Sequence, residues 1–133
     1  MSPLKLVPLA AVAALALLPV GAAAQSDQPT VIPVELSEFK FAPSEIVLNK
    51  GQHYVLRLTD SGKRDHDLSA KAFFQTVALA PGSAAKVKNG DVDLDEGESV
   101  DIALTPQKPG TYEMHCTEPF HAMLGMKGQI VVR

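Results

Sequence analysis

The sequence predicts an all-β domain in which short antiparallel strands pack as a sandwich. Two observations support this prediction: apolar residues recur with a step of two along several runs, and turn-forming residues separate those runs. A step of two is the period of a strand with one buried face. We find no internal repeat and no linker that would divide the domain.

Strands are expected where the alternation is clearest. In chain order these places are Ile32 to Leu36, Ile46 to Leu48, Tyr54 to Leu58, Val100 to Leu104, and Ile130 to Val132. Turns are expected between them, at Asn49-Lys50-Gly51, Ser61-Gly62-Lys63, Pro81-Gly82, Asn89-Gly90 and Lys108-Pro109-Gly110. Strands and turns at this spacing are typical of a sandwich.

Only the segment from Ala70 to Leu79 departs from this pattern. Phe73 and Val77 are four residues apart and Phe74 lies beside them, which permits a short helix or a packed loop. We favour the simpler interpretation, in which this segment is a lid of apolar residues over one edge of a sheet.

The N-terminal segment has the pattern of a secretory signal. Lys5 precedes an apolar run from Leu6 to Val20, and Ala22-Ala23-Ala24 supplies small residues for cleavage. A membrane anchor is the competing interpretation, but the run is shorter than the roughly 20 apolar residues that a spanning helix needs. We therefore expect residues 1–24 to be a cleaved signal peptide and residues 25–133 to form one domain.

The composition excludes some classes of partner. Fifteen acidic and twelve basic residues give a net charge of −3, and no basic patch is present, so nucleic acid is not expected as a partner. No apolar segment after the signal is long enough to cross a bilayer, so the mature protein should have no membrane span. The single cysteine, Cys116, is unusual in an exported chain and implies an intermolecular partner, a reactive thiol or a metal-bound thiolate.

Three potential metal ligands lie close together near the C-terminus. Cys116, His121 and Met126 follow one another at Cys-x4-His-x4-Met spacing, with Pro119 and Gly125 providing bends. A thiolate, an imidazole and a thioether are the ligands that suit copper in both oxidation states. A trigonal copper site takes two imidazoles, so a second histidine is expected from elsewhere in the chain.

Strand alternation selects that second histidine. His115 points away from the face shared by Met114 and Cys116, and His53 lies on the solvent face of its strand. His66 follows a polar turn and shares its face with the apolar Leu68. By elimination and by face, His66 is the candidate.

These motifs resemble those of the type 1 (blue) copper proteins, the cupredoxins. The resemblance also includes Phe-x-Phe-x-Pro at residues 39–43, Ile-Val-Leu-Asn-Lys-Gly at 46–51, and Gly-Thr-Tyr at 110–112, and the spacing of the ligand loop is most similar to that of rusticyanin. It implies a Greek-key β-sandwich of about seven to eight strands. It also implies that His66, Cys116 and His121 are equatorial copper ligands and that Met126 is the weaker axial ligand.

The same resemblance implies a function. We expect a periplasmic, monomeric carrier of single electrons, not an enzyme, with a redox partner such as a c-type cytochrome or a copper oxidase or reductase. Copper delivery by the same fold is the alternative, because Met114, Met123 and His115 near the loop could form a second Cu(I) arrangement.

Two residues depart from the family pattern. Asp67 stands where the family commonly has Asn or Ser, and a carboxylate near the thiolate would disfavour reduced copper unless it is protonated or accepts a hydrogen bond, for which Thr117 is a donor. Glu118 would add a polar rim to the apolar patch on which electron-transfer members usually dock their partners.

Other chemistries fit the residues less well. The acidic run Asp91-x-Asp93-x-Asp95 lacks the later Gly and acidic residue of a calcium loop, and an acidic surface hairpin is expected instead. A thiol hydrolase at Cys116 would need an orienting Asn or Asp in the loop, which is not evident. Zinc could occupy a site of one cysteine and two histidines, but the thioether of Met126 is a poor zinc ligand.

Overall fold

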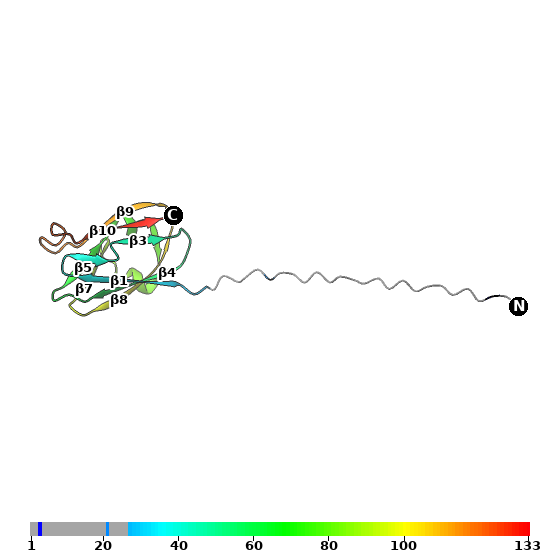
Figure 1. Cartoon of the computed structure of the whole chain (residues 1–133), viewed down its shortest axis with the longest axis horizontal. Helices are drawn as coiled ribbons and strands as arrows, with labels where there is room; N and C mark the ends of the chain where they lie inside the picture. The colour runs from blue at the N-terminus through cyan, green and yellow to red at the C-terminus, as the bar shows by residue number, and fades with distance from the viewer. Residues whose placement is uncertain (1–2, 4–20, 22–26) are drawn as a thin grey trace.

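The computed structural model describes residues 3, 21 and 27–133 of the chain. The expected signal peptide, residues 1–24, lies outside the described residues apart from Pro3 and Gly21, so its cleavage stays a prediction. Figure 1 shows the strands of the described residues packed together in two layers. No helix in the described part of the chain has the length and apolar character needed to cross a bilayer.

The described residues form two five-stranded sheets, in the orders β2-β1-β4-β8-β6 and β3-β10-β9-β5-β7. The elements in chain order are β1 (Thr30–Ser37), β2 (Lys40–Ala42), β3 (Glu45–Leu48), β4 (Tyr54–Asp60), β5 (His66–Ser69), α1 (Lys71–Phe74), β6 (Val77–Leu79), α2 (Pro81–Ala84), β7 (Asp91–Leu94), β8 (Ser99–Pro106), β9 (Gly110–His115) and β10 (Lys127–Val132). The predicted all-β sandwich is confirmed. The number of strands exceeds the predicted number of about seven to eight. Part of the reason is that β2 and β6 are separate strands of three residues each.

Most strand pairs are antiparallel, as predicted, but two are parallel. β1 runs parallel to β4, and β3 runs parallel to β10. The antiparallel pairing expected of the sandwich therefore holds for most pairs but not for these two. The reason is connectivity: after β2 the chain crosses to the second sheet as β3 and then returns to pair with β1 as β4, and parallel pairs require such a crossover.

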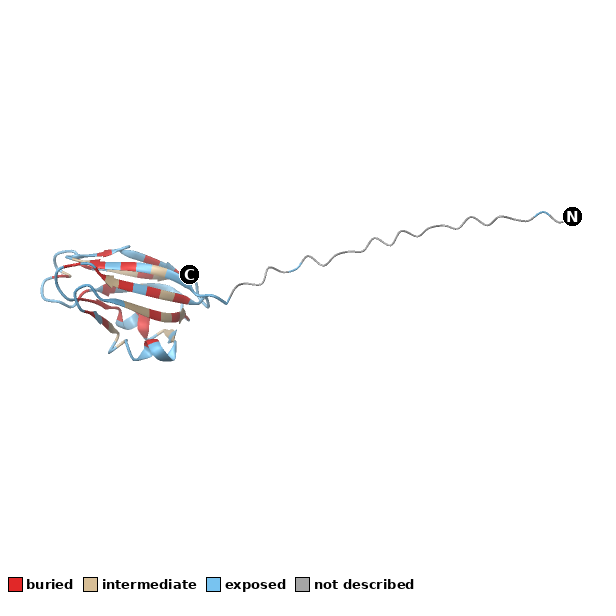
Figure 2. Cartoon of the chain, turned by 90° about the horizontal axis from the view of Figure 1, so that it is seen from below, coloured by how far each residue is buried: buried red, intermediate tan, exposed pale blue. Residues whose placement is uncertain are grey.

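The core lies between the two sheets and follows the predicted alternation. Along β4, Tyr54, Leu56 and Leu58 are buried while Arg57 is exposed, and Figure 2 shows the same alternation of buried and exposed residues along the strands. Burying one such aliphatic side chain stabilises the fold by about 1.5–3 kcal/mol. The alternation continues to Asp60, the last residue of β4, whose side chain is also buried.

The segment from Ala70 to Leu79 contains both a helix and a strand. Its first part forms α1, in which Phe73 is buried and lies edge-on to the ring of Tyr112 at 5.7 Å between centroids. Its last part forms β6, which extends the first sheet by pairing with β8. The expected lid over a sheet edge is thus an added edge strand preceded by one helical turn.

Candidate metal centre

The four predicted ligands come from two parts of the chain. His66 begins β5, whereas Cys116 follows β9, His121 lies in the loop after it, and Met126 immediately precedes β10. In Figure 1 this loop, orange-brown after β9, projects from one end of the sandwich. All four residues are buried, with relative exposures of 1%, 1%, 5% and 0% in chain order.

The structure brings the imidazoles and the thiol together. Cys116 Sγ lies 3.7 Å from His121 Nδ1, and the ring centroids of His66 and His121 are 5.1 Å apart. Backbone hydrogen bonds bring the ends of the loop together: the Cys116 N–H donates to the Met126 carbonyl at 3.1 Å, and the Met126 N–H donates to the His121 carbonyl at 2.9 Å. Residues 50 positions apart in sequence, His66 and Cys116, therefore meet at one end of the fold.

A buried carboxylate holds the ring of His66. Asp60 Oδ1 and Oδ2 both lie 3.0 Å from His66 Nδ1, and both side chains are fully buried. Asp60 Oδ1 also accepts the N–H of Gly62 at 2.9 Å. Asp60 was not among the predicted site residues, although the step of two along β4 puts it on the core face with Tyr54 and Leu58.

The other ring nitrogen of His66 is the one that could bind a metal ion. Nε2 is buried and has no hydrogen-bond partner among the residues that the structure describes. Leaving a buried polar atom unpaired is costly, and a metal ion would satisfy it. A free buried thiol, two imidazoles and a thioether are a donor set that fits copper.

The candidate ligands approach one another in pairs. Within the described residues, no three His, Cys, Asp or Glu side chains stand in an arrangement that could hold a metal ion. The assignment of His66, Cys116, His121 and Met126 as ligands therefore rests on their burial, their pairwise approach and the chemistry of their donor atoms.

A second buried carboxylate braces the start of the loop. Asp67 Oδ1 accepts the backbone N–H of Thr117 at 2.6 Å, and the Thr117 hydroxyl donates to Asp67 Oδ2. Asp67 is thus hydrogen-bonded by Thr117, the donor considered from the sequence. Burial raises the pKa of the Cys116 thiol to about 12, and the nearby carboxylate of Asp67 adds to the rise. Without metal the thiol is therefore protonated at neutral pH, and a bound metal ion would displace its proton.

The remaining histidines lie away from this cluster, as their strand faces predicted. His53 is exposed, and its Nδ1 lies 2.7 Å from the Thr105 hydroxyl. His115 is also exposed, on the face of β9 opposite to Met114. Met114 itself is buried, but Met123 is almost fully exposed.

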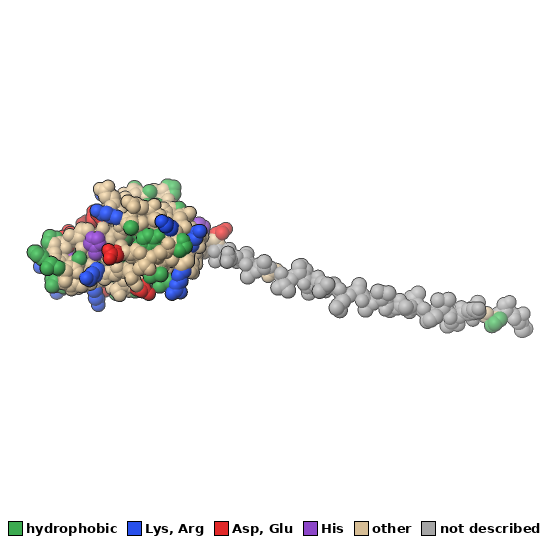
Figure 3. Space-filling model, turned by 90° about the horizontal axis from the view of Figure 1, so that it is seen from above, with side chains coloured by type: hydrophobic (Ala, Val, Ile, Leu, Met, Phe, Trp, Pro, Cys, Tyr) green, Lys and Arg blue, Asp and Glu red, His purple; other side chains and the backbone are tan. Residues whose placement is uncertain are grey.

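Exposed apolar side chains lie on the loop that carries His121 and at Phe39 beside it. We call Phe39, Phe120, Met123 and Leu124 the apolar loop patch; their exposures are 39%, 70%, 81% and 61%. Figure 3 shows hydrophobic side chains at this end of the molecule. The ring of Phe39 meets the ring of His121 edge-on at 5.2 Å. His121 itself is buried, with an exposure of 5%.

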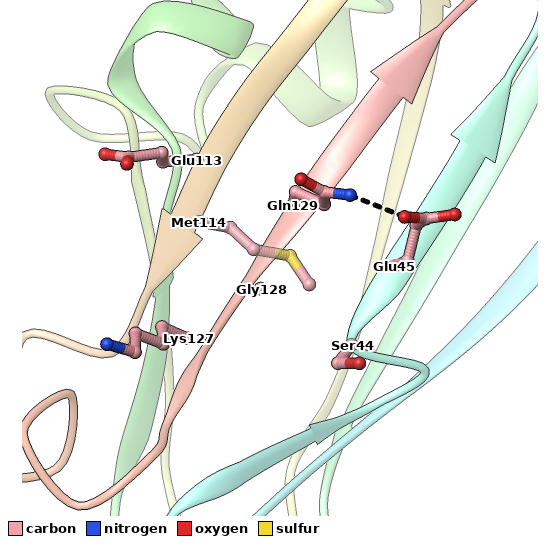
Figure 4. A pocket seen from close by; sticks show the side chains of 7 residues that line it. All are labelled: Ser44, Glu45, Glu113, Met114, Lys127, Gly128 and Gln129. Carbon is pink, nitrogen blue, oxygen red and sulfur yellow. Dashed lines mark hydrogen bonds between the residues drawn. The ribbon is translucent and has the colours of Figure 1, made fainter.

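A cavity of about 430 Å³ lies apart from the ligands, beside β3, β9 and β10. It is lined by Ser44, Glu45, Glu113, Met114, Lys127, Gly128 and Gln129 (Figure 4). None of the four candidate ligands contributes to its lining. In Figure 4 the side chain of Met114 extends over Gly128 toward Ser44, and the chain is close-packed there: a Cβ on Gly128 would lie 2.1 Å from the Ser44 carbonyl oxygen.

Solved structures of blue copper proteins have a similar fold. Auracyanin from the photosynthetic bacterium Roseiflexus castenholzii is 23% identical, with a TM-score of 0.59 over 78% of this chain and 97% of that one. Auracyanin A from Chloroflexus aurantiacus, described as a blue copper protein, is 22% identical, with a TM-score of 0.57 over 80% and 100%. A multicopper oxidase is similar over 44% of its own length at 9% identity, with a TM-score of 0.58. At these identities the likeness establishes the fold alone.

The sequence itself was also compared with known families and proteins. A search among curated proteins gave no match. The comparisons offer no support for the finer likeness to rusticyanin. The family model described as the cupredoxin-like domain matches residues 8–132, which is nearly the whole chain. The chain therefore belongs to the cupredoxin-like family.

Proposed function

We propose that this protein binds one copper ion through His66, Cys116, His121 and Met126 and carries single electrons between protein partners. The observation that supports this most is the pairing of a buried free thiol with a buried histidine nitrogen that lacks a partner in the described structure. Both atoms would be satisfied by a soft or borderline metal ion. Copper supplies the chemistry by cycling between Cu(II) and Cu(I).

The protein's contribution is to keep the ligands in place while the charge of the ion changes. His66 lies on β5, all four residues of which are buried, so its backbone has little freedom to move. Cys116 and Met126 are joined by a backbone hydrogen bond across the ends of the loop. Ligands held this way need little rearrangement between oxidation states, which is what a carrier requires. The protein alone would convert no substrate.

The apolar loop patch supplies a surface for docking beside the ligand His121. An exposed apolar patch of this kind marks an interaction site, and Phe39 contacts His121 directly. By family resemblance the partner would be a redox protein such as a c-type cytochrome or a copper oxidase or reductase. Glu118, which is exposed in the same loop, would contribute to the rim. Export by the signal at residues 1–24 would place this exchange in the periplasm, where residues 25–133 would act as a monomer.

Copper delivery is the alternative, and the structure gives it less support. It needs Met114, Met123 and His115 to act together as a second copper site. Met114 is buried and its side chain extends over Gly128, whereas Met123 is exposed on the loop and His115 faces away from Met114. A carrier with one closed site fits the burial of the four candidate ligands better.

Adding Cu(II) to the purified mature protein tests the proposal. We expect a strong visible thiolate-to-copper charge-transfer band that disappears on reduction and returns on oxidation. The band should be absent in Cys116→Ser, which replaces the thiolate sulfur by a hydroxyl. A colourless protein that hands Cu(I) readily to a chelator would instead support delivery.

Histidine variants test the ligand assignment. His66→Ala should abolish the band because it removes a buried donor, whereas His53→Ala and His115→Ala should retain it because both of those side chains are exposed. If colour survived in His66→Ala but not in His53→Ala, the assignment of the remote ligand would be wrong.

A further inference from the structure

We propose that Met123 is a modification site, at which peroxides oxidise the exposed thioether to a sulfoxide and so make the apolar loop patch polar. The two buried methionines of the described chain stay reduced under the same conditions. This inference goes beyond the proposed function, because it concerns a covalent change at the surface and needs no bound copper. Only its consequence for docking rests on the proposed function.

Exposure separates Met123 from the other methionines within residues 27–133. Met123 is 81% exposed, whereas Met114 and Met126 are 1% and 0% exposed. An oxidant dissolved in water must reach the sulfur atom, so exposed thioethers react before buried ones. Met126 lies only three residues after Met123 and is held inside the fold, where its N–H donates to the His121 carbonyl at 2.9 Å. The loop therefore presents one thioether to an oxidant and shields the other.

One turn of the loop places Met123 within the apolar loop patch. The Leu124 N–H donates to the Phe120 carbonyl at 3.0 Å, which is the hydrogen bond of a single helical turn. Residues three and four positions apart lie on the same face of such a turn. Phe120, Met123 and Leu124 therefore share the exposed face, while the intervening His121 is buried. An oxygen added to the sulfur of Met123 is added among these apolar side chains.

Backbone strain indicates that the patch is a built feature of the fold. Phe39 and Phe120 have φ angles of 60° and 69°, and they are two of the three non-glycine residues with positive φ in the described chain. This conformation is unfavourable for a bulky side chain. Burial of the rings does not explain the strain, because both rings are exposed. Strain of this kind gathers at functional surfaces, so the apolar character of the patch is expected to matter.

The oxidation is balanced by the peroxide alone. A lone pair of Met123 Sδ attacks one oxygen of hydrogen peroxide, and the O–O bond breaks as the S–O bond forms. The departing hydroxide takes the proton of the transferred oxygen and leaves as water, so the sulfur loses two electrons and the peroxide gains them. Methionine sulfoxide reductases reverse the change. In that step two thiols become a disulfide and the oxygen leaves as water.

The sulfoxide changes what can dock on the patch. Its oxygen is a hydrogen-bond acceptor, which water satisfies as long as the patch is exposed. A partner that covers the patch with apolar groups would remove this water and leave the oxygen unpaired, which is unfavourable. Oxidation of Met123 would therefore weaken docking without any change at the buried candidate ligands.

The first test is peptide mapping by mass spectrometry after treatment of the metal-free protein with dilute hydrogen peroxide. We expect Met123 to gain one oxygen completely while Met114, Met126 and the buried Cys116 remain unmodified. Oxidation of Met126 as fast as that of Met123 would overturn the proposal. Because no copper is present, this result does not depend on the proposed function. Absence of a charge-transfer band with Cu(II) would refute that function and leave the modification site standing.

The second test is retention on a phenyl matrix, which reports the apolar surface of the metal-free protein. The oxidised wild type should elute earlier than the untreated protein, and treatment with methionine sulfoxide reductases should restore its retention. Met123→Leu keeps an apolar side chain without sulfur, so peroxide should leave its retention unchanged. Met123→Gln is polar and of similar length, and it should elute early without peroxide. Unchanged retention of the oxidised wild type, or an equal shift in Met123→Leu, would show that Met123 does not control the patch.

Discussion

The candidate site has two halves that are built differently. The strand half consists of Asp60, His66 and Asp67 at the ends of β4 and β5, and all three side chains are buried. The loop half, residues 117–126, has no strand and exposes most of its side chains, with His121 and Met126 as its buried exceptions. The strand half is fixed by sheet pairing and buried carboxylates, whereas the loop half is fixed by a few backbone hydrogen bonds.

The two halves meet at two places. One is the pair of hydrogen bonds from Thr117 to Asp67, and the other is the approach of His121 to Cys116 and His66. The buried strands therefore hold the imidazole of His66 in place. The loop must be held against those strands to bring its own donor atoms close to His66. Substitutions in each half should therefore differ in what they disturb.

The largest expected effect is on the strand that anchors the loop half. Gly128 lies in β10, two residues after Met126, and a Cβ there would be 2.1 Å from the Ser44 carbonyl oxygen and 2.7 Å from Met114 Cε. Gly128→Ala must push β3 and β10 apart, and we expect it to lower the free energy of unfolding by about 3 kcal/mol. Urea unfolding of the metal-free protein measures this. Gly82→Ala, where nothing lies within 4 Å of the added Cβ, is the matched control; equal midpoints in the two variants would contradict the prediction.

The second effect falls on the strand half. A Cβ at Gly62 would lie 2.6 Å from His66 Cε1 and 3.2 Å from Asp60 Oδ1. Since His66 is buried and cannot swing away, Gly62→Ala should separate it from Asp60 and cost about 2 kcal/mol, the range for a hydrogen bond to a charged group. Unlike Gly128→Ala, it should also weaken the copper charge-transfer band of the variant that remains folded. An unchanged band and an unchanged unfolding midpoint would show that the pair tolerates the displacement.

Sequence patterns predicted the fold well because alternation and turn chemistry are local. Tyr54, Leu56 and Leu58 needed only a step of two to be placed in the core, and the all-β sandwich followed. The parallel pairing of β1 with β4 was not predictable in this way, because it depends on the chain crossing to the other sheet between them. Nor was the strand β6, whose three residues follow α1 and pair with β8, more than twenty residues later in the chain.

The site shows the same division between local and non-local information. Strand faces separated the buried His66 from the exposed His53 and His115, and the structure agrees with all three placements. Asp60 was missed because its importance comes from contact with His66 across a turn, although its place on the core face of β4 was visible. Coverage of His121 by Phe39 could not be foreseen, since those residues are far apart in the sequence.

The third prediction concerns the bond between the two halves. Asp67→Asn keeps the size of the side chain but replaces one acceptor oxygen by an amide, so one of the two Thr117 hydrogen bonds loses its acceptor. We expect a loss of about 1 kcal/mol in unfolding free energy. Hydrogen exchange should show faster opening at Thr117 and little change in β4. Asp93→Asn is the control for charge, and identical exchange in both variants would show that Asp67 does not hold the loop.

The smallest effect is expected from a surface pair on the outer face of the first sheet, which sets the baseline for the buried carboxylates. Arg57 Nε and Nη2 donate to the Asp101 carboxylate at 2.9 and 3.0 Å, and both side chains are about half exposed. Arg57 lowers the pKa of Asp101 below its usual range, so the folded state binds the Asp101 proton less readily than the unfolded state does. The stability from this pair is therefore present above the unfolded pKa, near pH 4, and is lost as the pH falls through the lower folded value. The unfolding midpoint of the wild type should exceed that of Asp101→Asn only slightly at pH 6, because solvent screens exposed pairs. The difference should vanish at lower pH, where Asp101 is protonated. If Asp101→Asn lowered stability as much as Asp67→Asn does, the buried carboxylates of the site would contribute no more to stability than exposed ones.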